Sequence, residues 1–422
     1  MALLQKELDI RVSSEIGRLR AVIVHTPGTE IARVNPENAE DLLFDDIVYL
    51  KDARKEHRNM LRLFRAAMPA DGNVIEILRL IRECFGLEDA RAFFVDQLAR
   101  LLHAEDRVTH ETELLALDPD EISKFAFAGT HPSIPHFELH PIPNILFTRD
   151  LAAVVNSGII LSNAAKRARS RESILFDMLV RYHPMFESVK NKSLRLSGSD
   201  TVEGGDILIP SPELALIGMS ERTSFSGILN VTKAMFEFGI KDVLVVDIPK
   251  QRASMHLDTI FTFTSKDECI VFPPAITGST GNVVRLSDDN GRMITTLMPS
   301  LKTALEASTG HDFRFISCGG ADPLNQRREQ WTDGANVFAL APGVVVGYER
   351  NTLTFNELAN HGYTVMNQFD FIAEYEEKDF EPDENTKIAI SFVGNELCRG
   401  RGGARCMTMP ILRDDIHPAV SE

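Results

Sequence analysis

Short apolar runs, each bounded by turn-forming residues, recur along most of the chain. The first covers residues 19–25 (LRAVIVH) and stops at the triplet 26–28 (TPG). A run of this length between turn residues is typical of a buried strand. The sequence therefore predicts a strand close to the N-terminus.

The hydrophobic pattern changes to helical spacing between residues 51 and 127. Val74, Ile77, Leu78 and Ile81 follow the i, i+3, i+4, i+7 spacing that puts side chains on one helix face. Further on, Asp118-Pro119 resembles a helix cap with proline in the first helical position. We expect an all-helical block of several short helices here, and we assign it no chemistry.

After the helical block, the order strand, hairpin turn, strand, helix and strand repeats. Four such units begin near residues 150, 206, 258 and 336. The strand at 19–25 and the apolar run Ile388–Val393 are expected to complete another unit between the two ends of the chain. Repeats of this kind close most easily as a ring of units about an axis. The pattern thus predicts an α/β fold with a ring of repeated units.

Three of these units begin with an aspartate at the equivalent position: Asp150, Asp206 and Asp258. Aspartate is unfavourable in strands, so three at strand starts need a reason. One of them alone would be interpreted as an ordinary turn or cap residue. Because rotation about a common axis would bring equivalent positions toward one centre, the three together favour a polar site.

A glycine-rich stretch at residues 399–410 (RGRGGARCMTMP) carries a candidate nucleophile. Its glycines allow left-handed or crowded backbone conformations, and Cys406 follows them with Arg405 beside it and Arg401 five residues before it. Nearby positive charge favours the thiolate, which is the nucleophilic form of cysteine. The stretch fits either a covalent catalyst under a closing lid or a basic turn with a buried, inert cysteine.

Composition narrows the classes of function. The 422 residues carry a formal net charge of -16, which argues against nucleic-acid binding because phosphate neutralisation needs a basic surface. The same charge is compatible with a cationic substrate. The five cysteines form no CxxC pair and no zinc-finger spacing, so we expect a reduced, cytoplasmic protein without a metal site. No stretch approaches the ~20 apolar residues of a membrane helix, so no membrane partner is expected.

Five motifs occur in an order that resembles the arginine deiminases of the guanidine-modifying superfamily. They are PN-x-x-FTRD (143–150), EGGD (203–206), GMSERT (218–223), MHLDT (255–259) and RGRGGARCMTMP (399–410). The resemblance covers nearly the whole chain. It implies a pseudo-fivefold ring, an α/β propeller of ββαβ units, formed by residues 1–50 and 140–422. An all-helical subdomain would be inserted at residues 51–139.

The resemblance also implies roles for individual residues. In catalysis, Cys406 would be the nucleophile, His256 the general acid and base, Glu203 its carboxylate partner, and Asp150 and Asp258 the groups that hold the guanidinium. In substrate binding, Asp206 would have a supporting role, and Asn144, Arg169 and Arg222 would bind the amino-acid end. Phe147 would line the channel, and Arg401 would close over the substrate. Arg167 and Arg171 are close enough in the sequence to replace Arg169. Leu151 departs from the family, where proline is frequent at this position, but it lies outside the charged set.

These residues suit the hydrolysis of L-arginine to L-citrulline and ammonia. A guanidinium is planar, always charged, and matches carboxylates bidentately, which leaves its carbon open to a thiolate. This chemistry needs no metal and no organic cofactor. The alternatives are an amidinotransferase, a deiminase of another guanidino compound such as agmatine or a methylated arginine, and a non-catalytic relative. Two arginines placed for a carboxylate argue against agmatine, and the sequence leaves open whether the chain forms a homo-oligomer.

Overall fold

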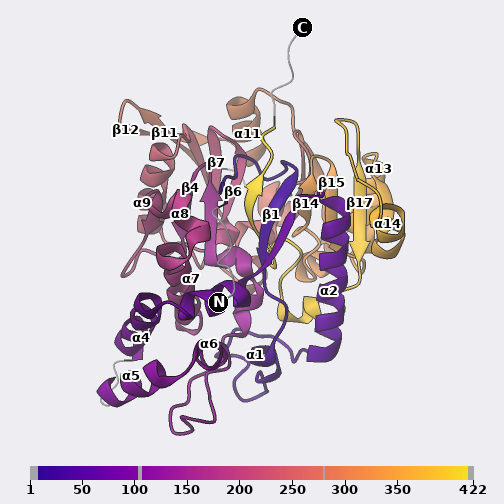
Figure 1. Cartoon of the computed structure of the whole chain (residues 1–422). Coiled ribbons are helices and arrows are strands. Elements are labelled where there is room, and N and C mark those ends of the chain that lie inside the picture. Colours follow the sequence, from indigo (N-terminus) through magenta and orange to yellow (C-terminus); the bar gives the residue numbers. More distant parts are fainter. Residues whose placement is uncertain (1–7, 103–106, 279–280, 417–422) are drawn as a thin grey trace.

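The computed structural model describes residues 8–102, 107–278 and 281–416, and its strands form five separate sheets. None of the sheets closes on itself within these residues. Helices surround the sheets, with α4, α5 and α6 gathered at one corner and α13 and α14 at the opposite side (Figure 1). Within the same ranges, every helix is too short or too polar to span a lipid bilayer. The chain therefore has the α/β character that its repeats predict.

Four sheets begin one after another along the chain. Their strands are β3 (Ala152–Val155), β4 (Gly158–Leu161) and β5 (Ser193–Arg195); β6 (Ile207–Ser211), β7 (Leu214–Met219), β8 (Asp242–Asp247), β11 (Val283–Asp289) and β12 (Arg292–Met298); β9 (Phe261–Phe263), β10 (Glu268–Val271) and β13 (Arg314–Ser317); and β14 (Phe338–Ala341), β15 (Val344–Tyr348), β16 (Thr364–Asn367) and β17 (Ile388–Phe392). In each sheet the first two strands are antiparallel, and the second strand also pairs with a parallel one. The predicted repeating unit is therefore present.

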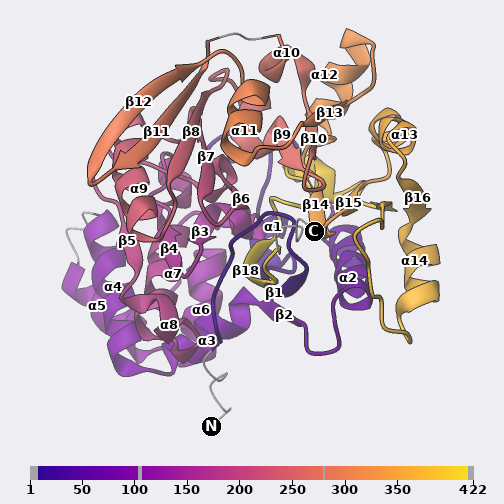
Figure 2. The same cartoon turned by 90° about the horizontal axis from the view of Figure 1, so that it is seen from above.

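The fifth sheet joins the two ends of the chain. Its order is β18 (Met409–Arg413), β1 (Leu19–Val24) and β2 (Asn73–Glu76), with β18 antiparallel and β2 parallel to β1. Figure 2 shows β1 and β18 between the β6–β12 sheet on one side and the β14–β17 sheet on the other.

Two details of the predicted topology are wrong. The run at 388–393, expected to complete the terminal unit, forms β17 and lies between β15 and β16. An apolar run identifies a buried strand but not its partner, and β18 takes the place beside β1 instead. The block at 51–127 is not all helical either, because residues 73–76 form β2 and pass directly into a helix without a turn. The helical spacing that begins at Val74 therefore spans two different elements.

Helices lie between the strands of the repeated units, and a further group of helices precedes the first unit. Those before residue 140 are α1 (Thr29–Ala32), α2 (Leu50–Ala67), α3 (Ile77–Phe85), α4 (Glu88–Leu102), α5 (Arg107–Ala116) and α6 (Pro119–Ala128); those after it are α7 (Ser170–Tyr182), α8 (Glu187–Lys190), α9 (Phe225–Glu237), α10 (Pro273–Ile276), α11 (Leu301–Thr309), α12 (Pro323–Trp331), α13 (Thr352–Asn360) and α14 (Gln368–Tyr375). The expected cap is present, since the Asp118 carboxylate accepts hydrogen bonds from the backbone N–H groups of Asp120 and Glu121. Apolar side chains of α3, α4 and α6 share one core with β3, β4 and α7, so these helices pack directly on the first unit.

A 3₁₀ turn precedes the first strand of each of the first three units. These turns are Thr148–Leu151, Gly204–Asp206 and Leu257–Thr259, and they contain Asp150, Asp206 and Asp258. The aspartates thus lie just before the strands rather than in them, which avoids their poor fit to strand geometry. Asn336 and Cys406 occupy the corresponding places, shortly before β14 and β18. Each unit therefore carries one such position.

Candidate active site

Contacts between neighbouring units hold these five inner turns together. Four are hydrogen bonds: the Leu257 N–H to Asp206 Oδ1 at 2.8 Å, Asn336 Nδ2 to the Asp258 carbonyl at 3.0 Å, the Cys406 N–H to Asn336 Oδ1 at 3.1 Å, and the Arg149 N–H to the Cys406 carbonyl at 3.1 Å. The remaining contact is steric. A Cβ at Gly204 would lie 2.1 Å from the Arg149 carbonyl oxygen, so only glycine allows the two turns to approach this closely. The contacts bring every inner position next to two others.

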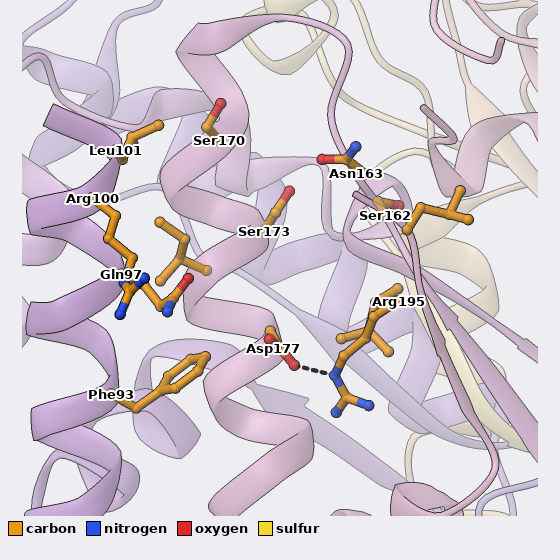
Figure 3. Close-up of a pocket in the computed structure, with 13 residues that line it drawn as sticks. Phe93, Gln97, Arg100, Leu101, Ser162, Asn163, Ser170, Ser173, Asp177 and Arg195 are labelled. Atoms are coloured by element: carbon orange, nitrogen blue, oxygen red, sulfur yellow. Dashed lines mark hydrogen bonds and ion pairs between the residues drawn. The ribbon is translucent and has the colours of Figure 1, made fainter. Parts of the chain in front are cut away.

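A small cavity of about 20 Å³ lies beside these turns, and of the five inner positions Asp150 and Cys406 line it. Eight of the residues predicted for the site line it: Asn144, Phe147, Asp150, Arg169, Arg222, His256, Arg401 and Cys406. Glu203 and Asp258 lie outside the lining but contact His256 and Cys406, and Asp206 accepts the backbone N–H of Leu257, next to His256. Larger cavities exist elsewhere, including one of about 470 Å³ between α4 and α7 in which Asp177 pairs with Arg195 (Figure 3). None of the predicted residues lines that cavity, so size does not identify the site.

His256 is held between two carboxylates. Its Nε2 lies 2.8 Å from Glu203 Oε2, and its Nδ1 lies 3.6 Å from Asp150 Oδ1. Burial alone would lower the pKa of His256, but the charges of Asp150, Glu203 and Asp206 outweigh it and raise the pKa to about 9. Burial likewise opposes ionisation of Glu203, yet its contacts with His256 and two arginines lower its pKa to about 2. At neutral pH the pair is therefore an imidazolium and a carboxylate.

Cys406 is buried beside acids rather than bases. Its Sγ lies 3.9 Å from Asp258 Oδ2, and the side chain is 4% exposed. Burial, and then the charges of Asp258 and Asp150, raise the pKa of the Cys406 thiol well above its usual value. The prediction that Arg405 favours the thiolate is wrong, because its guanidinium points away and binds Glu15 at 3.0 Å and Asp258 at 2.8 Å. In the empty site the cysteine is a thiol.

Each of the two aspartates nearest the thiol leaves one oxygen without a hydrogen bond. Asp150 Oδ2 accepts from Arg169 at 2.5 Å and Asp258 Oδ2 accepts from Arg405 at 2.8 Å. Asp150 Oδ1 and Asp258 Oδ1 are fully buried and have no hydrogen-bond partner among the described residues. A buried acceptor in this state is costly, and a ligand with several N–H donors removes that cost.

Asp206 is buried beneath the site, where its carboxylate joins two turns by hydrogen bonds. Its carboxylate accepts hydrogen bonds from the hydroxyls of Ser220 at 2.5 Å and Thr223 at 2.6 Å, and from the Leu257 N–H. Burial raises the pKa of Asp206 to about 6, although these donors and His256 oppose it. Its hydrogen bonds tie the GMSERT turn to the turn that follows His256, which agrees with a supporting place.

The predicted groups for the amino-acid end of a ligand gather at one wall of the cavity. Arg169 binds Asp150 and Glu172, and Arg222 Nη1 lies 3.7 Å from Glu203. Asn144 donates to the Leu42 carbonyl, and Arg169 donates to the Asn144 carbonyl.

The two alternative arginines lie elsewhere. Arg167 and Arg171 line a different cavity, where Arg171 donates to the carbonyl of His140. The structure thus places Arg169, and neither alternative, in the wall beside Asp150.

Arg401 covers the cavity from the glycine-rich stretch. Its backbone is left-handed, with φ of 63°, and its guanidinium stacks on the Trp331 ring at 3.4 Å from the centroid. Arg401 Nε and Nη1 have no hydrogen-bond partner among the described residues, so they are free to meet a ligand. Burial raises the pKa of the nearby Asp333 to about 7 even though Arg401 opposes it.

Several contributors lie outside the predicted set. Leu43, Arg252, Met255 and Gly400 also line the cavity, and Trp331 and Asn336 contact Arg401 and Cys406. Glu15 binds Arg405, which in turn binds Asp258. Met255 and Gly400 belong to the motifs described above, and Asn336 begins the fourth repeat, so a signal existed for these three. No signal in the sequence links Leu43 or Glu15 to residues more than a hundred positions away.

Asp150, Glu203 and His256 also have the composition of a metal site. One ligand atom from each lies within 4.8 Å of the others. However, Arg169 Nη1 is already 2.5 Å from Asp150 and 3.7 Å from Glu203, and Arg222 is at the same distance from Glu203. These guanidinium groups supply the positive charge that a divalent cation would bring, and they would repel one. The cluster fits a planar organic cation better than a metal ion.

Comparison with solved structures defines the class of fold. The chain matches an amidinotransferase from Microseira wollei in the saxitoxin biosynthetic pathway with a TM-score of 0.53 and 12% identity, covering 97% of this chain and 98% of the other. It also matches a dimethylarginine dimethylaminohydrolase with a TM-score of 0.50 and 14% identity, covering 93% and 99% of the two chains. At these identities the likeness shows the fold alone, which this chain shares with both enzymes.

Sequence comparison then gives the family. The family model described as arginine deiminase matches residues 95–413. A relative named arginine deiminase from Bacillus cereus is 36% identical over 96% of this chain and 99% of its own length. Another, from Oenococcus oeni, is 34% identical over 98% of this chain and 100% of its own length. The chain belongs to the arginine deiminase family.

The ion pair between His256 and Glu203 generates a prediction for the pKa of the imidazole. Since the carboxylates raise this pKa to about 9 against the effect of burial, Glu203→Gln should lower it by about 1–3 units. A pH titration followed by NMR of ¹⁵N-labelled histidine measures the change. Glu83→Gln is the matched control, because it removes the carboxylate 2.9 Å from His183, outside the site. The assignment is wrong if His256 titrates at the same pH in wild type and Glu203→Gln.

Proposed function

We propose that the chain hydrolyses free L-arginine to L-citrulline and ammonia through a covalent thiouronium intermediate on Cys406. Membership of the arginine deiminase family supports the reaction. The observation that carries the residue roles is the pair of unsatisfied buried oxygens, Asp150 Oδ1 and Asp258 Oδ1, beside the thiol. A guanidinium offers several N–H donors in one plane, so it can bind both oxygens and keep its carbon exposed to sulfur.

Substrate binding activates the nucleophile. In the empty site, burial and the charges of Asp258 and Asp150 keep Cys406 protonated. A bound guanidinium places a full positive charge between the two carboxylates, which reverses the local charge and favours the thiolate. The thiol proton leaves to solvent, and the thiolate forms only when the carbon that it attacks is present. The buried cysteine is thereby protected from other electrophiles.

The first half of the reaction releases ammonia. The thiolate attacks the guanidinium carbon and forms a tetrahedral adduct with a new S–C bond. His256, protonated because its pKa is about 9, donates its proton to the leaving nitrogen. The C–N bond breaks, ammonia departs, and a positively charged thiouronium remains on sulfur. The Glu203 carboxylate, 2.8 Å from Nε2, orients the imidazole and stabilises its charge.

The second half uses the neutral imidazole as a base. His256 removes a proton from water as the water oxygen attacks the thiouronium carbon. The S–C bond then breaks, the oxygen becomes the ureido carbonyl of citrulline, and the hydroxyl proton returns to sulfur. His256 is again protonated and Cys406 is again a thiol. No step needs a redox change or a metal-bound water.

The opposite end of arginine would meet Arg169, Arg222 and Asn144. Arg222 has a buried Nε with no hydrogen-bond partner among the described residues, so it can bind the α-carboxylate without losing an existing hydrogen bond at that atom. Arg169 reaches the same wall, although it also binds Asp150. Phe147 would flank the aliphatic chain, and Arg401 would close the entrance.

We infer the arrangement of the chain and its setting from the same features. The five sheets with one shared pairing pattern, and the contacts that join their inner turns, support a pseudo-fivefold propeller of ββαβ units. Because β2 pairs with β1, the propeller would include α2 and β2 besides residues 1–50 and 140–422, and the insertion would begin after β2 instead of at residue 51. Five unpaired cysteines support a reducing, cytoplasmic location.

Incubation of the purified protein with L-arginine tests the function. Citrulline and ammonia should appear in equal amounts, and Cys406→Ala should produce neither because the intermediate forms on the Cys406 sulfur. Cys398→Ala is the control, since this thiol lies eight residues away and contacts Arg350 instead. If an added amine acceptor were required and ornithine were released without citrulline, the reaction would be amidino transfer and the proposal would fail.

Arg222→Leu tests the carboxylate-binding wall. A charge-assisted pair lost in a closed site costs roughly 2–5 kcal/mol, or about 30-fold to several thousand-fold in kcat/KM. That loss should apply to L-arginine but not to agmatine, which lacks the carboxylate and should be a poor substrate of the wild type. Measuring kcat/KM for both substrates on both proteins completes the cycle. Equal losses for the two substrates would exclude Arg222 as the anchor.

A further inference from the structure

Asn336 holds the fourth of the five inner positions. The others are Asp150, Asp258 and Cys406, which the proposed function uses, and Asp206, which joins two turns beneath the site. Asn336 lies shortly before β14, and its side chain is 1% exposed. It is the one inner position that carries an amide, and neither the motifs nor the proposed mechanism assigns it a role.

The amide bridges the two neighbouring units through their backbones. Its Oδ1 accepts the N–H of Cys406 at 3.1 Å, and its Nδ2 donates to the carbonyl of Asp258 at 3.0 Å. The glycine-rich stretch approaches it closely, because a Cβ at Gly403 would lie 2.7 Å from Oδ1. Asn336 therefore contacts both the residue proposed as nucleophile and the residue proposed to grip the guanidinium.

The amide is the functional group that this place requires. A carboxylate could accept the Cys406 N–H, but it could not donate to the Asp258 carbonyl. It would also add a further negative charge beside a thiol that already lies near Asp150 and Asp258. A shorter neutral side chain such as serine could not reach both backbone groups. The hydrogen bond donated to the Asp258 carbonyl and the absence of charge distinguish asparagine from aspartate at this position.

We propose that Asn336 is a positioning residue that fixes the backbone of Cys406 against that of Asp258 and so sets the thiol in line with the bound guanidinium. This proposal rests on the proposed role of Cys406 as the nucleophile. Reacting groups must be placed to within a fraction of an ångström, and misplacement by about 1 Å costs on the order of 100-fold in rate. The effect of Asn336 should therefore fall on kcat more than on KM.

Asn336→Asp tests the proposal with a nearly isosteric change. We expect kcat to fall by about 10- to 100-fold while KM changes by less than about threefold. Iodoacetamide labelling of Cys406, followed by peptide mass mapping across pH, should shift its midpoint upward by about one pH unit because a negative charge is added near the thiol. The matched control is Asn351→Asp. Asn351 is equally buried and makes hydrogen bonds to Thr332 instead of the site.

The outcomes separate a positioning role from a structural one. The proposal is overturned if Asn336→Asp keeps the wild-type kcat and labelling midpoint, or if Asn351→Asp loses as much of both. If the aspartate variant does not fold, Asn336→Ser tests the positioning role instead, because it removes the amide without adding a charge. It should lower kcat with an unchanged labelling midpoint, and a wild-type kcat would overturn the proposal. Labelling uses no substrate, so a shifted midpoint is measurable even if Cys406→Ala were to show that the proposed chemistry is wrong.

Discussion

The buried carboxylates around Cys406 are the interaction on which the rest of the site depends. Asp150 and Asp258 each use one oxygen to bind an arginine of the protein and keep the other unsatisfied. Unpaired buried acceptors destabilise the folded chain, so they persist only because the surrounding structure fixes them. The same charge that disfavours the thiolate in the empty site favours a cation beside it. In the proposed function, substrate recognition and nucleophile activation thus both depend on the charge of these carboxylates.

Such a site needs backbones that approach one another very closely. The inner turns bring one residue from each sheet to a common centre, and bonds such as Asn336 to Cys406 keep them in register. Only glycine fits at positions 204 and 403, because a Cβ at either Gly204 or Gly403 would overlap a neighbouring turn. Arg405 and Arg169 provide the positive charge that lets several acids be buried together. The proposed chemistry therefore depends on the close packing of these turns.

Much of the site could be predicted from the sequence, because repeated units place equivalent residues at equivalent structural positions. Once three aspartates are seen at equivalent positions of repeated units, a shared polar site can be predicted, and the motifs then supply His256 and Cys406. Contacts that depend on side-chain direction could not be predicted: Arg405 is adjacent to Cys406 in sequence, yet its guanidinium pairs with Glu15 and Asp258. The predicted partner of the strand at residues 388–393 was wrong because an apolar pattern does not specify which strand pairs with it. Asn336 was visible as the start of a repeat, but only the comparison of all five turns reveals its place.

In the proposed reaction, the buried thiol of Cys406 becomes a nucleophile and carries the substrate carbon. Rapid acid quenching of the wild-type protein during turnover of L-arginine, followed by intact-mass measurement and peptide mapping, tests it directly. The account predicts an adduct with the mass of arginine less ammonia, located on Cys406 and absent from Cys406→Ala. Its amount should rise before the steady state and fall as arginine is exhausted. Full citrulline production with an unmodified Cys406 throughout, or with the adduct on a different residue, would contradict the account.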